Sequence, residues 1–148
     1  MATLRAAVLA LLQADTPLMT LLTGGLSDWD ALGREGLTMS TAQLEADGVS
    51  IKPTGVLTWS TETPEMESYG TRGRRRFCQV WAYSHDSYST IESVLRAAEN
   101  ALHRVTVPTD EAGTVLLVYA NDGPDFLAEE LGNAFGRFAR FYIQMGRR

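Results

Sequence analysis

The chain has 148 residues, with 45% hydrophobic and 21% charged side chains, a composition that predicts one globular domain over residues 1–148. The formal net charge of −5 argues against general nucleic-acid binding, and the single cysteine, Cys78, excludes an internal disulfide framework. The lone cysteine and the lack of a signal-peptide pattern lead us to expect folding in a reducing cytosol.

The first predicted element is a helix over residues 3–14. Its apolar side chains recur at the helical period and form one stripe, namely Leu4, Val8, Leu11 and Leu12. Polar residues interrupt this helix, which is too short to cross a membrane. Thr16 and Pro17 predict the cap and first turn of a second short helix, which Gly24 and Gly25 would end.

Residues 24–50 carry the weakest periodicity, and we predict a flexible insert there. Trp29 and Leu32 are expected to anchor this segment against the domain. Ser40 and Gln43 have the spacing of a capping box, so a two-turn helix is predicted to follow and to end at the next glycine. Strand signals begin directly after that glycine.

A long hairpin is predicted next. Residues 56–61 alternate, with Leu57 and Trp59 on one face, and residues 62–74 form an extended tip that contains Gly and Pro. The two arms of the tip carry opposite charge: Glu62, Glu65 and Glu67 on the first, and Arg72, Arg74, Arg75 and Arg76 on the second. A basic cluster therefore interrupts an otherwise acidic chain.

Three interpretations of the Arg72–Arg76 cluster remain open. It is a solvated loop tip without a function, or one half of a contact between subunits, or a nucleic-acid contact. The third has no support from the net charge or from a recognised binding motif. Exposed ion pairs contribute only about 0–1 kcal/mol, so their expected use is in register and partner choice.

The basic arm leads into a strand over residues 75–84 with two apolar faces. Phe77, Gln79, Trp81 and Tyr83 share one face, and Cys78, Val80 and Ala82 share the other. Such a strand is predicted to be central, with its small-residue face under a helix. That helix is predicted over residues 90–103, with a Ser89–Glu92 capping box and an apolar stripe of Ile91, Val94, Leu95, Ala98 and Leu102.

Two more strands are predicted, at residues 115–119 and 138–145, and the segment 126–131 between them suits a short helix or a loop. The order of elements predicts an α+β fold, in which helices pack on one face of an antiparallel sheet of about four to five strands.

No catalytic or metal-binding constellation is visible. His85, His103 and Cys78 are far apart in sequence, and Cys78 lies within an apolar strand face where a thiol is inert. Adjacent residues such as Ser84 to Ser87 cannot form a catalytic triad. We therefore expect no enzymatic activity, no cofactor and no metal.

The whole chain resembles a known family through the order and apolar pattern of its segments. These are LRAAVLALLQADTPL at the start, RRRFCQVWAYS before the helix IESVLRAAENALH, then VLLVY, and RFARFYIQM near the end. This layout resembles the tail-terminator (tail-completion) proteins of long-tailed bacteriophages and prophages.

The resemblance implies a structural virion protein that forms a ring, usually a hexamer, on the last ring of the tail tube. Such a ring ends tube polymerisation and offers a surface for head joining. The implied partners are other copies of the chain, the tail tube protein and the head–tail connector protein, while DNA passes through the ring without specific binding. The implied location is the head-proximal end of the tail, after assembly in the host cytoplasm and without a membrane.

A ring also requires two different complementary patches on every subunit. We hypothesise that Arg74, Arg75 and Arg76 contact acidic residues of a neighbour, such as Glu62, Glu65 or Glu67. Two alternatives stay open: another head–tail connector or neck protein, and a nucleic-acid-binding module that uses Arg72–Arg76.

Overall fold

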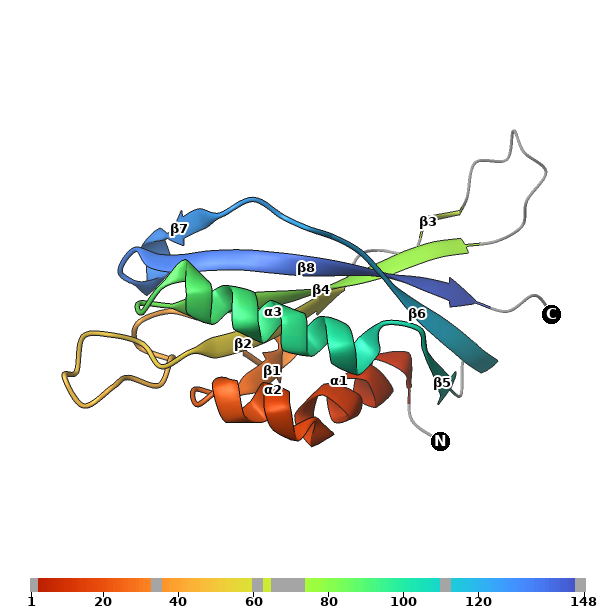
Figure 1. The fold of residues 1–148 in the computed structure, drawn as a ribbon, viewed down its shortest axis with the longest axis horizontal. Helices are drawn as coiled ribbons and strands as arrows, with labels where there is room; N and C mark the ends of the chain where they lie inside the picture. Colours follow the sequence, from red (N-terminus) through yellow and green to blue (C-terminus); the bar gives the residue numbers. More distant parts are fainter. Residues whose placement is uncertain (1–2, 33–35, 60–62, 65–73, 110–112, 146–148) are drawn as a thin grey trace.

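One β-sheet organises the fold (Figure 1). The computed structural model describes residues 3–32, 36–59, 63–64, 74–109 and 113–145. Within these residues the sheet has eight strands, six of which follow the spatial order β1-β2-β4-β8-β6-β5. They are β1 (Leu26–Asp28), β2 (Thr54–Trp59), β4 (Arg74–Ser84), β8 (Ala134–Met145), β6 (Gly113–Asp122) and β5 (Val105–Thr109). The short strands β3 (Thr63–Pro64) and β7 (Phe126–Ala128) pair with β4 and β8.

The mixed content of helices and mostly antiparallel strands is compatible with the predicted α+β class, but four to five strands was too low a number. The strands missed by the sequence are β1, β3, β5 and β7, which have three, two, five and three residues. Segments this short hold too few residues for an alternating pattern to be recognised. The β1–β2 pair is also parallel, because the chain returns to β2 through the long segment between them.

The strand at the end of the chain lies inside the sheet. β8 pairs with β4 along one edge and with β6 along the other, so β4 and β8 are its two central strands. This confirms the central position predicted for β4. The sequence pattern did not reveal that β8 is central too, because order along the chain does not determine order in the sheet.

Two helices open the chain, α1 (Leu4–Ala14) and α2 (Thr16–Leu21). Both were predicted, but the cap of α2 was assigned one residue too late. The side chain of Asp15 accepts the hydrogen bond from the Leu18 N–H, and Thr16 is already helical. An aspartate at this position also stabilises the positive end of the helix dipole.

The third helix, α3 (Tyr88–Leu102), begins earlier than its predicted capping box. The cap is Ser87, which has extended backbone angles and accepts a hydrogen bond from the Thr90 N–H at 3.3 Å. Ser89 is therefore inside the helix, where a hydroxyl cannot cap the first turn. The predicted apolar stripe is confirmed, since all five of its residues are buried.

All three helices contribute to one core with a single face of the sheet. Helices α1 and α2 bury Leu4, Val8, Leu12 and Leu18, and α3 lies over β4 and β8 (Figure 1). On the sheet side of this core, β4 contributes small or branched side chains and β8 contributes Phe141 and Ile143. Burial of each large apolar side chain contributes about 1.5–3 kcal/mol, so this shared core dominates the stability of the fold.

The predicted helix after Ser40 does not form. Side chains in this segment bond to nearby backbone instead: the Thr41 hydroxyl accepts from the Thr38 N–H, and Asp47 accepts from the N–H groups of Val49 and Ser50. Such local bonds offer the backbone an alternative to the helical ladder. The strand β2 starts at Thr54, two residues before the predicted alternating segment 56–61, and Val49 is exposed.

The segment 126–131, which suited a short helix or a loop, is a strand followed by a single 3₁₀ turn, η3 (Glu129–Leu131). Ala128 and Leu131 are buried here with Ile51 and Ala134 in a second, smaller apolar cluster. The turn ends at Gly132, whose φ of +63° favours glycine.

Candidate functional site

The predicted hairpin forms, and its basic arm begins β4. Thr63 pairs with Arg75 and Pro64 with Arg74, which continues the antiparallel pairing of β2 with β4. The acidic residues Glu62, Glu65 and Glu67, together with Arg72 and the tip at 65–73, lie outside the described residues. The charge contact predicted for this hairpin therefore stays a prediction.

Arg76 is the member of the basic cluster with a described side chain. Its guanidinium carbon lies 5.1 Å from the centre of the Trp59 ring. The Nε atom of Arg76 and the indole Nε1 of Trp59 are both buried without a hydrogen-bond partner. A buried donor without a partner costs about 1–3 kcal/mol, so this arginine–tryptophan pair is a place where an additional acceptor would be stabilising.

The sheet face opposite the main core carries aromatic side chains. On β4, the side chains of Phe77, Gln79 and Trp81 alternate with those of the buried core residues. On β8, Tyr142 and Phe138 pair with Phe77 and Trp81. The side chains of this face, which we call the open face, are half-buried: Phe77, Gln79, Trp81, Leu116, Val118, Phe138, Arg140 and Tyr142. No helix of the described residues packs on it, since the helices share the opposite face with the main core.

Two features order the open face. The Trp81 indole donates to the Thr58 hydroxyl at 2.8 Å, and that hydroxyl donates to the Gln79 side chain at 3.3 Å. Trp81 also packs at 4.6 Å from the ring centre of Phe138. At its other end the face is covered, because Leu37, Met39 and Leu44 pack with the second apolar cluster beside Tyr83. Burial there raises the pKa of Tyr83 to about 12.

Arg140 is the cation of the open face. Its guanidinium carbon lies 4.7 Å from the centre of the Phe77 ring and 5.6 Å from that of Phe138. Its Nε atom is buried without a hydrogen-bond partner, and no carboxylate of the described residues forms an ion pair with it. Stacking of this kind holds a guanidinium in place while its outer edge remains able to bind a carboxylate.

An acidic surface lies at one end of the molecule, where the loop before β2 approaches η3 (Figure 1). We call it the acidic edge and define it by Asp47, Val49, Leu127, Glu129 and Glu130. All five side chains are exposed, with 69% exposure for Val49 and 54% for Leu127. Backbone hydrogen bonds from Ser50 and Val49 lower the pKa of Asp47, which keeps its carboxylate charged.

His85 connects the two halves of the acidic edge. Its Nδ1 atom accepts a hydrogen bond from the Ile51 N–H at 2.9 Å, so the proton resides on Nε2, which donates to the Gly132 carbonyl at 3.0 Å. Both ring nitrogens are therefore engaged with backbone groups. This side chain is a structural link, and neither nitrogen remains for a proton-transfer role or for a metal.

A network of side-chain ion pairs joins α3 to the sheet. Arg96 contacts Glu99 and Asp122, each at 2.5 Å, and also Glu92, one helical turn before it, at 3.4 Å. Arg137 contacts Glu92 and lies 2.5 Å from Asp125. Hydrogen bonding to Asp125 is the main cause that raises the pKa of Arg137. Every arginine here has several carboxylate partners, so the network holds α3 against β6 and β8.

The residues considered for chemistry do not assemble into a site. Cys78 is fully buried, and burial raises the pKa of its thiol to about 12. Ser84 is also buried, and its hydroxyl accepts from the Asp86 N–H. The Nδ1 atom of His103 accepts from the Tyr119 N–H. In the described part of the chain, no group of three or more His, Cys, Asp or Glu residues has the arrangement needed to hold a metal ion.

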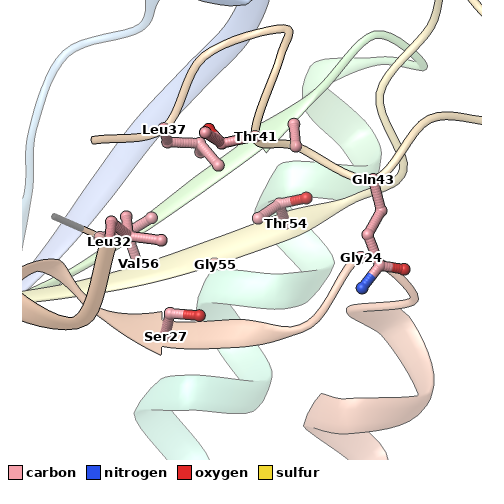
Figure 2. Close-up of a pocket in the computed structure, with 10 residues that line it drawn as sticks. Gly24, Ser27, Leu32, Leu37, Thr41, Gln43, Thr54, Gly55 and Val56 are labelled. Atoms are coloured by element: carbon pink, nitrogen blue, oxygen red, sulfur yellow. The ribbon is translucent and has the colours of Figure 1, made fainter. Parts of the chain in front are cut away.

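Figure 2 shows a pocket of about 120 Å³ between β1, β2 and the loop that precedes β2. None of its described lining residues is charged. The hydroxyls of Thr41 and Thr54 donate to the carbonyls of Gly36 and Lys52, so they are already engaged within the chain. The volume is well below the roughly 300–1,000 Å³ of typical ligand sites. This pocket offers neither room nor reactive groups for a substrate.

Comparison with known proteins gives a similarity of fold. One solved chain, from the virion of a native gene transfer agent particle, superposes with a TM-score of 0.65 at 15% sequence identity. The match covers 97% of this chain and 94% of the other. No protein-family model matches the sequence, and no curated protein matches it either.

None of the helices formed by the described residues combines the length and the apolar character that crossing a bilayer requires.

Sequence reasoning identified the β4 half of the open face but not its β8 half or the acidic edge. The alternation of Phe77, Gln79 and Trp81 along the chain was the signal that identified the β4 half of the open face. Arg140 joins them only because β8 pairs with β4 in one register, with Gln79 opposite Arg140. The acidic edge depends on a contact between segments about 80 residues apart, for which the sequence holds no local signal.

Proposed function

We propose that this chain is a structural component of a phage-like virion, and within it the tail terminator. In this role, copies of the chain form a ring on the last ring of the tail tube, end its polymerisation and offer the surface for head joining. The observation that carries the proposal is the similarity of fold, over 97% of this chain, to a chain of the gene transfer agent virion. The order of segments described above resembles the tail-terminator family and supports the finer assignment.

The described surfaces support a role in assembly rather than in catalysis. His85, in the turn between β4 and α3, is engaged by backbone groups, and the pocket in Figure 2 is small and has no charged residue in its described lining. By contrast, an aromatic face with one arginine and an exposed acidic edge are features of protein contacts. We therefore propose a non-enzymatic protein without cofactor, located at the head-proximal end of the tail after assembly in the host cytoplasm.

The proposed partners are other copies of the chain in a ring, most simply a hexamer, the tail tube protein and the head–tail connector protein. DNA would pass through the ring without specific binding, which suits a chain of net charge −5. The hairpin arginines Arg74, Arg75 and Arg76 are proposed to contact an acidic surface of a neighbour. If their joint reversal to glutamate leaves assembly unchanged, this part of the proposal is wrong.

Deletion of the gene from the particle-forming element that encodes it tests the function directly. Loss of a terminator should leave tubes of uncontrolled length, visible by negative-stain electron microscopy. Loss of a neck protein would instead leave tails of normal length that lack heads. Particles of normal form and number would contradict any structural role. Light scattering on a size-exclusion column, over a concentration series, would then report the mass of the purified protein and any ring.

A further inference from the structure

We propose that the open face of one copy binds the acidic edge of a second copy, and that Arg140 forms ion pairs there with the carboxylates of Glu129 and Glu130. The inference deepens the proposed function, because a ring needs one contact of this kind between every pair of neighbours. It names surfaces that lie outside the hairpin predicted from the sequence.

The first argument is the state of Arg140. Its guanidinium is held between two aromatic rings, its Nε is buried without a partner, and no carboxylate of the described residues pairs with it. By contrast, the arginines that do form ion pairs with described residues, Arg5, Arg96 and Arg137, each have at least two carboxylate partners. An oriented cation on an apolar surface is complementary to an incoming carboxylate.

The second argument is the state of the acidic edge. Glu129 and Glu130 are exposed, and neither has an ion pair with another described residue. Leu127, two residues before Glu129, has 54% of its surface exposed although most leucines of the described chain are buried. An exposed apolar side chain flanked by acids matches an apolar face that contains a cation, both in polarity and in charge.

The third argument is geometric. Leu127 pairs with Phe135 on β8, five residues before Arg140. Side chains alternate along a strand, so an odd separation places the Leu127 pair and Arg140 on opposite faces of β8. Within one copy, no ion pair of the described residues joins Arg140 to Glu129 or Glu130, so both surfaces are available to neighbouring copies. A contact between two different surfaces is heterologous, and its repetition closes a ring when the rotation between neighbours permits.

Charge exchange tests the contact. The variants are Arg140→Glu, the double variant Glu129→Arg with Glu130→Arg, and a chain that carries all three changes. Each reversed surface alone should weaken self-association about tenfold or more, measured by sedimentation velocity over a concentration series. The combined chain should recover association, because the opposite charges meet again across the contact. The matched control is Arg104→Glu, which makes the same charge change at an exposed position of the loop after α3.

Leu127→Ser provides a variant with little expected effect on folding, since more than half of the side chain is exposed. It should weaken association without changing the thermal unfolding midpoint. Unchanged association in this variant and in both charge reversals, with a folded chain, would overturn the contact. So would a chain that stays monomeric up to millimolar concentration. In either case, tubes of uncontrolled length after gene deletion would leave the proposed function standing, so the two failures are distinguishable.

Discussion

At the scale of the residue, burial and local hydrogen bonds decide what each polar side chain can do. Cys78 and His85 belong to residue types that often carry chemistry, yet both are committed to the fold. The thiol is enclosed by the main core, and the imidazole joins three segments through backbone groups. Their roles in stability lead to two measurable expectations.

The thiol of Cys78 should be inert in the folded protein. Burial raises its pKa to about 12, whereas a thiol in an unfolded chain titrates near about 8.5. The neutral thiol is therefore the form that the fold stabilises. We expect no reaction with a disulfide reagent such as DTNB at pH 8 until guanidinium unfolds the chain. Because the folded pKa is the higher one, stability should fall as the pH rises above the unfolded value.

Rapid labelling of Cys78 under native conditions, in a sample whose circular dichroism is that of the folded chain, would contradict this assignment. It would mean that the core opens locally at the β4 strand.

Removal of the His85 side chain should destabilise the protein. His85→Ala loses two hydrogen bonds that connect Ile51 to Gly132, with an expected cost of about 1–3 kcal/mol in urea unfolding. His103→Ala is the matched control, because His103 is exposed and makes one bond to a backbone N–H. Equal losses in both variants would show that the link through His85 contributes no more than an ordinary surface hydrogen bond.

At the scale of the element, the helices form where their apolar periodicity predicts them, but the caps of α2 and α3 lie at earlier residues than predicted. The capping pattern at Ser89 is genuine as a sequence signal, and Ser87 lies two residues before it. The structure selects Ser87, because the backbone there is extended and its hydroxyl reaches the Thr90 N–H. The choice between two nearby serines thus depends on where the chain leaves β4.

Alanine substitution distinguishes the two serines. Ser87→Ala should cost about 0.5–2 kcal/mol of folding free energy, since it removes the cap of α3. Ser89→Ala is the matched control and should be close to neutral, because an exposed helical position favours alanine. Chemical denaturation followed by far-ultraviolet circular dichroism measures both. A larger loss at Ser89 would restore the capping box predicted from the sequence.

The strands illustrate a different limit. The longer strands β2, β4, β6 and β8 were predicted, and the range 75–84 covers nearly all of β4, whereas the ranges 115–119 and 138–145 miss residues of β6 and β8. The four short strands were not, and each of them pairs with a longer strand. A segment of two or three residues has no preference strong enough to form a strand alone.

At the scale of the whole molecule, charge is distributed unevenly around one fold. Acids gather at the end formed by the loop before β2 and η3, while Arg140 lies on the sheet face that no described helix covers. A molecule with separate acidic and basic surfaces attracts its own copies when the two surfaces are complementary.

Self-association of the wild-type chain should therefore weaken with salt. Charges that meet across an interface are screened over about 8 Å at physiological ionic strength and about 3 Å at 1 M. We expect the dissociation constant, measured by sedimentation at 0.05 M and 0.5 M sodium chloride, to rise with the salt concentration. The chain with all three charge exchanges should show the same trend. Association that strengthens with salt would indicate a contact governed by apolar burial alone.

The sequence by itself determined the helices α1, α2 and α3, the longer strands, the apolar stripe of α3 and the absence of any local catalytic motif, although it also predicted a helix after Ser40 that does not form. These features depend on periodicity and on neighbours along the chain, so their signal is complete within a short window. It also indicated the hairpin and its charges, whose contacts remain a prediction.

Only the tertiary structure decided the sheet order, the parallel β1–β2 pair and the position of Arg140 beside Gln79. It also brought the loop before β2 to η3, where His85 joins them. Each of these depends on which distant segments meet. That choice follows from the joint burial of apolar faces, a property of the whole chain that no local pattern contains.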